Sequence, residues 1–163
     1  MTTDAPRPTD AMLRAILTEA RTFACVGMSA DPIRPSHYVG AYLSRRGYRV
    51  IAVNPALAGR TLFGVPARGT LSAVDEPVDV LDVFRRSDAV PAIVEEALRV
   101  LPGLRCVWLQ IGVVSEEART MCAEAGVAFV EDRCPKIERQ RLFGELRQGG
   151  FATGIISARL PRT

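Results

Sequence analysis

Short apolar runs alternate with segments of helical periodicity along most of this 163-residue chain. The runs are rich in β-branched residues and predict strands at residues 22–27, 49–53, 78–84, 104–111 and 127–130. Apolar side chains at helical spacing predict helices at residues 9–21, 36–47, 89–101 and 116–125. Strands that are joined through helices form right-handed βαβ units and lie parallel. The sequence therefore predicts an α/β fold, a Rossmann-like, doubly wound, mostly parallel sheet of about five strands with helices on both faces.

The length fits a single domain. Residues 9–147 carry the predicted core and form that domain, whereas residues 148–163 lack periodicity and are expected to form a mobile tail. The glycine-rich residues 59–69 predict an irregular connection or a short extra strand around residues 61–65.

Charge and cysteine usage exclude several classes of function. The formal net charge is only +3, and no basic run is interleaved with aromatic residues, so we expect no nucleic-acid partner. No apolar stretch approaches the length of a membrane span, and the first eight residues are polar, so we expect a cytoplasmic protein with no membrane contact. The four cysteines lack CxxC spacing and the histidine is single, which predicts free thiols and no metal site.

The segment at residues 26–36 has the position of a phosphate-binding loop between a strand and a helix. It holds one early glycine, Gly27, where the dinucleotide fingerprint GxGxxG requires three. Arg34 offers a charged fork for phosphate. Asn54 and Pro55 follow the second strand, where an NAD-binding domain usually places an acidic residue for the ribose. The sequence therefore favours a nucleotide-type ligand other than NAD.

Other candidate site residues follow from topology, because ligands of an open α/β sheet bind beyond the carboxyl ends of its strands. Read strand by strand, those ends give the candidates Gly27, Met28, Ser29, Arg34, Asn54, Pro55, Phe84, Arg85, Gln110 and Cys134.

Several of these residues also have a purely structural interpretation. Gly27 is equally well explained by close packing of strand and helix, and Ser29 by a local turn. Phe84 is more typical of a core side chain, and Gln110 of one that satisfies backbone groups at a strand end. Cys134 is the one thiol that the pattern places in the predicted cleft.

No catalytic set emerges from the sequence. Ser36 is interpreted as a helix N-cap and His37 as a surface residue of the first helical turn. Asp79 and Asp82 are three residues apart in a strand pattern, on opposite faces, and do not form an acid–base pair. The sequence therefore favours a binding protein over an enzyme.

Several ordered stretches carry a family resemblance: VGMS at 26–29, RPS at 34–36, GYRVIAVNP at 47–55, VLDVFR at 80–85, Pro91 with IVEEA at 93–97, VWLQIGV at 107–113 and EDRCPKIE at 131–138. Through them, residues 12–142 resemble the small CoA-binding domain proteins, which are related to the CoA-binding domain of succinyl-CoA synthetase α subunits. The resemblance implies a Rossmann-like fold and coenzyme A as the ligand. The implied contacts are the phosphates for Gly27, Met28, Ser29 and Arg34, the adenosine portion for Asn54 and Pro55, and the rest of the cleft for Phe84 and Arg85.

The leading hypothesis is a stand-alone protein that binds coenzyme A or an acyl-CoA, with the pantetheine arm toward Gln110 and Cys134. A mixed disulfide between Cys134 and the CoA thiol would give it a redox or storage role. One alternative is the CoA-binding component of a split acyl-CoA ligase, since the residues after 142 are too few for a ligase domain and His37 does not match the phosphorylated histidine of the synthetase. The others are an NAD-dependent oxidoreductase and an interaction module with an empty cleft.

Overall fold

The structure, a computed structural model, describes residues 7–145, and the predicted tail at residues 148–163 lies outside this range. The strands are β1 (Thr22–Val26), β2 (Arg49–Val53), β3 (Thr61–Leu62), β4 (Val65–Pro66), β5 (Val80–Val83), β6 (Cys106–Leu109) and β7 (Ala128–Val130). The α-helices are α1 (Asp10–Glu19), α2 (Pro35–Arg45), α3 (Val90–Val100), α4 (Glu116–Ala125) and α5 (Pro135–Leu142). No helix within residues 7–145 is long and apolar enough to cross a membrane.

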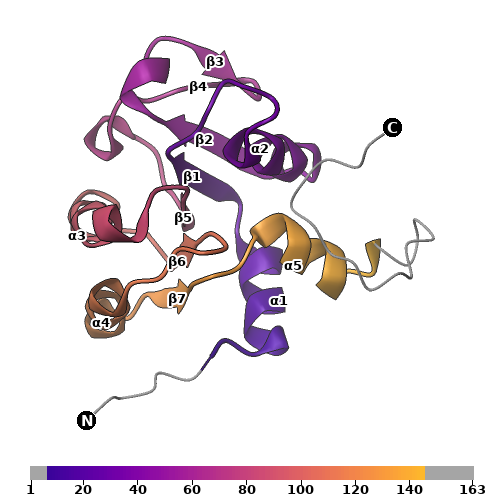
Figure 1. Cartoon of the computed structure of the whole chain (residues 1–163), viewed down its shortest axis with the longest axis vertical. Coiled ribbons are helices and arrows are strands. Elements are labelled where there is room, and N and C mark those ends of the chain that lie inside the picture. Colours follow the sequence, from indigo (N-terminus) through magenta and orange to yellow (C-terminus); the bar gives the residue numbers. More distant parts are fainter. Residues whose placement is uncertain (1–6, 146–163) are drawn as a thin grey trace.

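Five strands form one parallel sheet in the order β2-β1-β5-β6-β7 (Figure 1). The chain runs from β1 to β2 on one side and then crosses back to β5 on the other side of β1. Strand order therefore reverses between β1 and β5, and the carboxyl ends of these two strands flank the place where such sheets bind ligands. The predicted Rossmann-like fold is confirmed.

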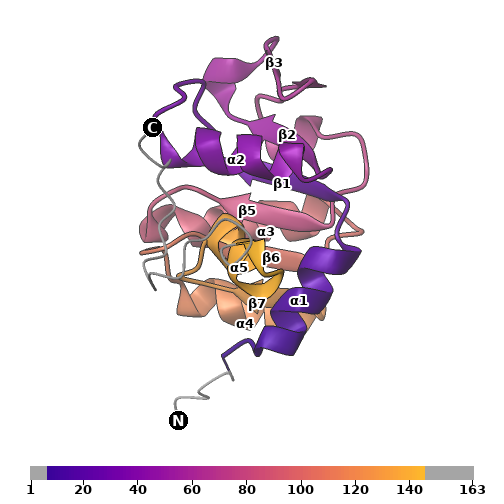
Figure 2. The same cartoon turned by 90° about the vertical axis from the view of Figure 1, so that its right-hand side faces the viewer.

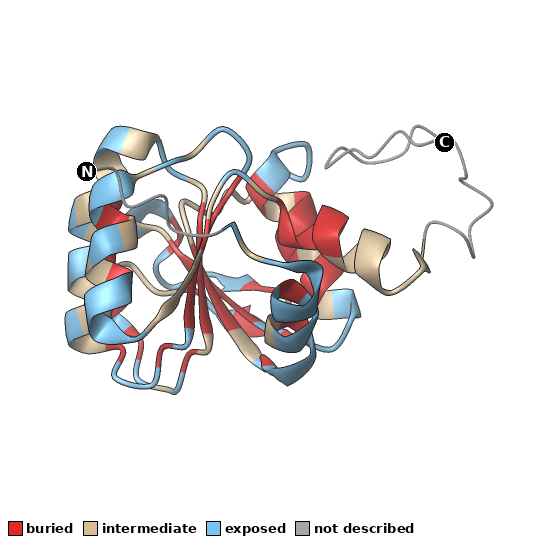
Figure 3. Cartoon of the chain, turned by 90° about the horizontal axis from the view of Figure 1, so that it is seen from below, coloured by how far each residue is buried: buried red, intermediate tan, exposed pale blue. Residues whose placement is uncertain are grey.

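Two apolar cores lie on the two faces of the sheet (Figure 3). We call the face covered by α1, α2 and α5 the first face, and Figure 2 shows these helices in front of the strands. Helices α3 and α4 cover the second face. Because strand side chains alternate, Phe23 and Cys25 of β1 enter the first core and Ala24 enters the second. This three-layer packing fixes the strand ends that surround the site.

Local sequence explains where the elements begin and end. All four residues of β6, CVWL, are buried, as is usual for a central parallel strand with both faces covered. At α4 the Ser115 side chain accepts a hydrogen bond from the Ala118 backbone N–H, and glutamates fill the first turn. Gly126 ends the helix in the left-handed region, at φ 70°, where glycine has no Cβ penalty.

The structure differs from the sequence prediction in four places. The strands predicted at residues 78–84 and 104–111 are shorter, and the glycine-rich stretch forms the β3–β4 hairpin. Helix α5 was not predicted, because its residues are mostly charged and its apolar side chains Ile137 and Leu142 do not repeat at helical spacing. Arg141 joins α5 to α1 through two hydrogen bonds to Asp10, at 2.8 and 3.0 Å.

The backbone of Gly27, after β1, lies close to the backbone of Phe84, after β5. Gly27 has φ 85°, and its N–H donates to the Val53 carbonyl at 3.1 Å. A Cβ atom at Gly27 would lie 2.7 Å from the carbonyl oxygen of Phe84. Glycine is therefore required here both by its φ angle and by the closeness of the next strand.

We expect Gly27→Ala to lower the free energy of unfolding by about 3 kcal/mol, because a positive φ costs about 1–2 kcal/mol and the backbone clash adds to it. Gly59→Ala is the matched control, since Gly59 has φ 83° and open space around the position of a Cβ. Its loss should be only about 1 kcal/mol. Urea denaturation of both variants measures the difference, and equal losses would show that the approach to Phe84 is unimportant.

Candidate functional site

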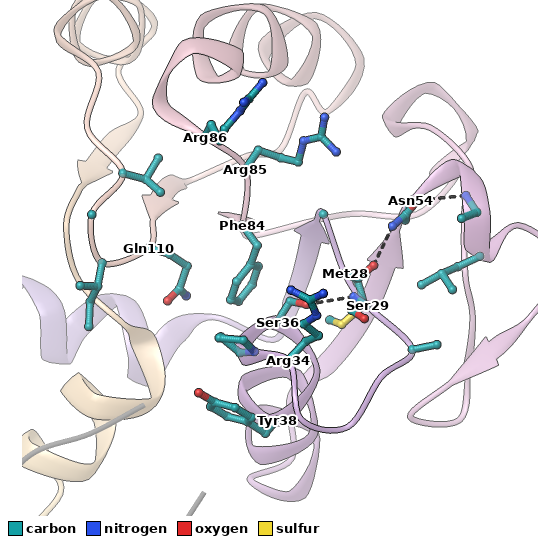
Figure 4. Close-up of a pocket in the computed structure, with 18 of the residues that line it drawn as sticks. Met28, Ser29, Arg34, Ser36, Tyr38, Asn54, Phe84, Arg85, Arg86 and Gln110 are labelled. Atoms are coloured by element: carbon teal, nitrogen blue, oxygen red, sulfur yellow. Dashed lines mark hydrogen bonds between the residues drawn. The ribbon is translucent and has the colours of Figure 1, made fainter. Parts of the chain in front are cut away.

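A cavity of about 1160 Å³ opens at the carboxyl ends of the strands, where strand order reverses. Its walls come from the ends of β1, β2, β5 and β6, the start of α2 and one residue of α5 (Figure 4). Asn54 lies on the β2 side and Gln110 on the β6 side, with Phe84 between them. The volume is sufficient for a small-molecule ligand.

Hydrogen bonds hold the loop after β1 against the start of α2. The Ser36 hydroxyl accepts from the Ser29 N–H at 2.9 Å, and the Ser29 hydroxyl accepts from the Asp31 N–H at 3.0 Å. His37 Nδ1 lies 2.9 Å from the Ser29 carbonyl, which can only accept, so this nitrogen donates. The loop is therefore built by its own side chains, and His37, which is half-buried, is committed to it.

The predicted role of Ser36 as an N-cap is wrong. Helix α2 begins at Pro35, its N-cap residue is Arg34, and no side chain among the described residues caps it. Pro35 favours a helix start here because it has no N–H to satisfy. The Ser36 hydroxyl bonds the loop instead of the helix end. Pro35 has no N–H, and the N–H groups of His37 and Tyr38 donate to the Arg34 carbonyl, so the Ser36 N–H is the first-turn amide of α2 left without a bond among the described residues.

The carboxamide of Asn54 makes hydrogen bonds within the protein through both its nitrogen and its oxygen. Its Nδ2 donates to the Met28 carbonyl at 2.8 Å, and its Oδ1 accepts from the Ala56 N–H at 2.9 Å. The side chain therefore ties the end of β2 to the loop after β1. Pro55 does not line the cavity and starts the short 3-10 helix Pro55–Leu57.

The cavity is lined by three arginines, Arg34, Arg85 and Arg86, and by no acidic residue among those described. Neither Arg34 nor Arg85 forms an ion pair with any residue in the range 7–145. Arg86 lies 3.7 Å from Asp88, but both side chains are largely exposed and the pair is weak. Three arginines in the lining, one of them at the N-terminus of α2, make the cavity favourable for an anion.

Behind Gln110 lies a buried carboxyl group that sequence reasoning set aside. Asp82 of β5 is fully buried, and Gln110 Nε2 donates to its Oδ1 at 3.0 Å. Its Oδ2 has no hydrogen-bond partner among the described residues. Burial raises the pKa of Asp82 to about 7, against a smaller lowering by Gln110. The sequence signal was an acidic residue inside an otherwise apolar strand.

Cys134 lies outside this cavity. It is 1% exposed and borders a separate hollow of about 790 Å³ with residues of β7 and α4. Burial raises the pKa of its thiol to about 11. The pKa values of Cys25, Cys106 and Cys122 are also raised by burial. No three His, Cys, Asp or Glu side chains in the described chain are grouped so as to hold a metal ion.

Eight of the ten predicted site residues line the cavity, all except Pro55 and Cys134. That they contact a ligand stays a prediction. Sequence reasoning missed lining residues such as Tyr38 and Ile137, which come from a helix face and from the unpredicted α5. The topological rule finds residues at strand ends and gives no signal for side chains that helices bring over them.

Comparison with known proteins gives one family. The family described as CoA binding domain matches residues 21–140. The uncharacterized protein YneT of Bacillus subtilis (strain 168) is 37% identical over 130 residues, which are 80% of this chain and 93% of that protein.

Solved structures agree with this comparison. A Thermus thermophilus protein, cell-free ID.343, is 44% identical, with a TM-score of 0.78 over 83% of this chain and 99% of that one. A hypothetical protein from Pyrococcus horikoshii OT3 is 32% identical, with a TM-score of 0.77 over 87% of this chain and all of that one (100%). An acetyl-coenzyme A synthetase from Ca. Korarchaeum cryptofilum shares the fold at 21% identity, with a TM-score of 0.53 over 66% of this chain and 25% of that enzyme.

We expect the four cysteines of the native protein to react with Ellman's reagent at least about 100-fold more slowly than free cysteine, because they are buried and thiolates are the reactive species. Unfolding in guanidinium should release all four at once. The thiolate released by the reagent is measured by its absorbance at about 412 nm. Comparison with the Cys134→Ser variant gives the part of the reaction that is due to Cys134. Fast modification of Cys134 in the native state would restore it as a reactive group.

Proposed function

Because the chain belongs to the CoA binding domain family, we propose that it binds coenzyme A or an acyl-CoA in the cavity at the strand-order reversal. The observation that carries this proposal is the lining of that cavity, with three arginines, an uncapped helix N-terminus and no acidic residue among those described. Coenzyme A is an elongated molecule with three phosphates at one end, and such a lining favours it over neutral or cationic ligands.

The pyrophosphate would lie against the loop after β1 and the first turn of α2. Gly27, Met28, Ser29 and Ser36 line this part of the cavity. The N–H groups of Gly27 and Ser29 already donate to the Val53 carbonyl and to Ser36 Oγ, so the backbone amides proposed for phosphate are those of Met28 and Ser36. Arg34 stands at the N-cap of the same helix, so its charge adds to the helix dipole. Phosphate at a helix N-terminus is a recurrent solution to anion binding in α/β proteins.

The adenosine portion would lie beside Asn54 and Leu57, and the pantetheine arm would pass Phe84 toward Gln110. Phe84 is half-buried and supplies an apolar wall in the middle of the cavity. Ile111 is 56% exposed and borders the far end, where an apolar part of a ligand would cover it. Cys134 is not part of this proposal, since it is buried outside the cavity.

The oxidoreductase alternative is disfavoured by the end of β2. An NAD-binding domain usually holds the ribose with a carboxylate there, whereas this chain has Asn54, whose amide already bonds Met28 and Ala56. The Nδ2 and Oδ1 atoms each already make one hydrogen bond within the loop, and a neutral carboxamide is a weaker acceptor for ribose hydroxyls than the carboxylate usual at this position.

Isothermal titration calorimetry of the purified protein with coenzyme A and with NAD tests the proposal. We expect one coenzyme A per chain and an affinity at least about ten-fold above that for NAD, a difference of about 1.4 kcal/mol. The affinity for coenzyme A should fall as salt is added, because charge attraction supplies part of it. Tighter binding of NAD, or no binding of coenzyme A, would overturn the proposal.

We expect Arg34→Ala to weaken coenzyme A binding by about ten-fold or more, since a charge-assisted hydrogen bond contributes about 1.5–3 kcal/mol. Arg99→Ala is the matched control, because Arg99 is an exposed arginine in the last turn of α3 and does not line the cavity. It removes the same charge and should leave the affinity within about two-fold. Equal losses in the two variants would mean that only the overall charge matters.

A further inference from the structure

Asp82 is a carboxyl group in the first core without a cationic partner in the range 7–145. It lies in β5 between Cys25 of β1 and Trp108 of β6, according to the strand register. The titratable groups near it on neighbouring elements are the thiols of Cys25 in β1, Cys106 in β6 and Cys134 before α5, which burial keeps neutral. A fully buried acid is costly to a fold, so its one polar contact is informative.

That contact is with a residue of the cavity. Gln110 is 8% exposed, lines the cavity, and donates through Nε2 to Asp82 Oδ1 at 3.0 Å. An ionised carboxylate only accepts hydrogen bonds, so it must face the nitrogen of the carboxamide. Gln110 Oε1 has no hydrogen-bond partner among the described residues, and Gln110 lines the cavity, so this oxygen is the carboxamide atom left for a ligand.

We propose that Asp82 is a positioning residue that holds the carboxamide of Gln110 with its oxygen toward the cavity, where it accepts a hydrogen bond from an N–H group of the ligand's arm. The inference rests on the proposed function and adds the chemistry of one end of the site. Coenzyme A carries two amide N–H groups in its pantetheine arm, and either one is a suitable donor. A ligand with only an acceptor at this end would place that acceptor against Gln110 Oε1, and the two oxygens would repel each other.

The charge of Asp82 controls this orientation. When Asp82 is ionised, only the nitrogen of Gln110 satisfies it; when it is protonated, it can also donate to the oxygen, and both orientations of the carboxamide become possible. Burial places the pKa of Asp82 at about 7, so the change falls in the neutral range. Binding of an N–H donor favours the ionised state, and the affinity must therefore rise as pH rises through this range.

The test compares coenzyme A with ADP, which lacks the pantetheine arm, on the wild type and on Asp82→Asn between pH 5.5 and 8.5 (chosen to bracket about 7). We expect Asp82→Asn to bind coenzyme A about five- to ten-fold more weakly at pH 8 and to bind ADP as the wild type does. The phosphates of coenzyme A titrate in the same way with both proteins, so their effect drops out when the wild-type affinity is divided by that of Asp82→Asn. That ratio should rise with pH only because of Asp82.

Two further variants separate positioning from folding. Asp79→Asn changes an acid of the same segment that accepts from the N–H groups of Arg21 and Thr22 at the other end of the strand, and should retain the wild-type pH profile. Gln110→Met removes the acceptor, and the double variant with Asp82→Asn should bind coenzyme A no more weakly than Gln110→Met alone. Circular dichroism of each variant verifies the fold.

A carboxyl ¹³C NMR titration of the wild type supplies evidence without any substitution. Coenzyme A should lower the pKa of Asp82, and ADP should leave it unchanged. If coenzyme A binds and this pKa stays constant or rises, or if Asp82→Asn keeps the wild-type profile, the inference is wrong while the proposed function stands. If coenzyme A does not bind the wild type, the proposed function is overturned and the inference with it.

Discussion

The close approach of two backbones at Gly27 is the constraint on which the rest of the site depends. The end of β1 and the end of β5 lie so near that a single methyl group would enter the space held by the Phe84 carbonyl. Because the strand order reverses between these same two strands, the approach sets the floor of the cavity. The loop after β1 and the arginines after β5 directly follow these two strand ends, so the spacing of the strand ends sets where both segments begin.

The site divides its polar groups into two sets. Asn54, Ser29, Ser36 and His37 are bonded to backbone groups and maintain the shape of the loop. Arg34 and Arg85 are exposed and make no ion pair with a described residue, so their charges face whatever enters. Neutral hydrogen bonds thus fix the shape of the loop, and the unpaired arginines attract an anion. Because different side chains do these two jobs, an anion can bind the arginines without breaking the hydrogen bonds of the loop.

Much of this arrangement could be predicted from the sequence because it depends on local patterns. The runs of β-branched residues and the helical spacing are properties of a few neighbouring residues, and a parallel sheet follows from their alternation. The strand-end rule then found Gly27, Phe84 and Gln110 beside the cavity. It failed for Cys134, because α5 follows immediately and buries the thiol in the first core.

Asp82 shows a second limit of sequence reasoning. Its position in the strand pattern was visible, but its importance depends on a neighbour 28 residues away, Gln110, and on the absence of a nearby cation in the described part of the chain. Such a pairing is a property of strand register, which the sequence of a single strand does not contain. The same holds for Ser36, whose hydroxyl bonds the loop instead of its own helix end.

The self-bonded loop after β1 has a consequence for the speed of recognition. Since Ser29, Ser36, His37 and Asn54 already hold the loop in place, an arriving molecule does not have to wait for the loop to fold around it. For the proposed anionic ligand, association should then be limited by diffusion and accelerated by the arginines, most strongly at low ionic strength. How long the molecule stays is decided separately, by the contacts it makes farther along the cavity.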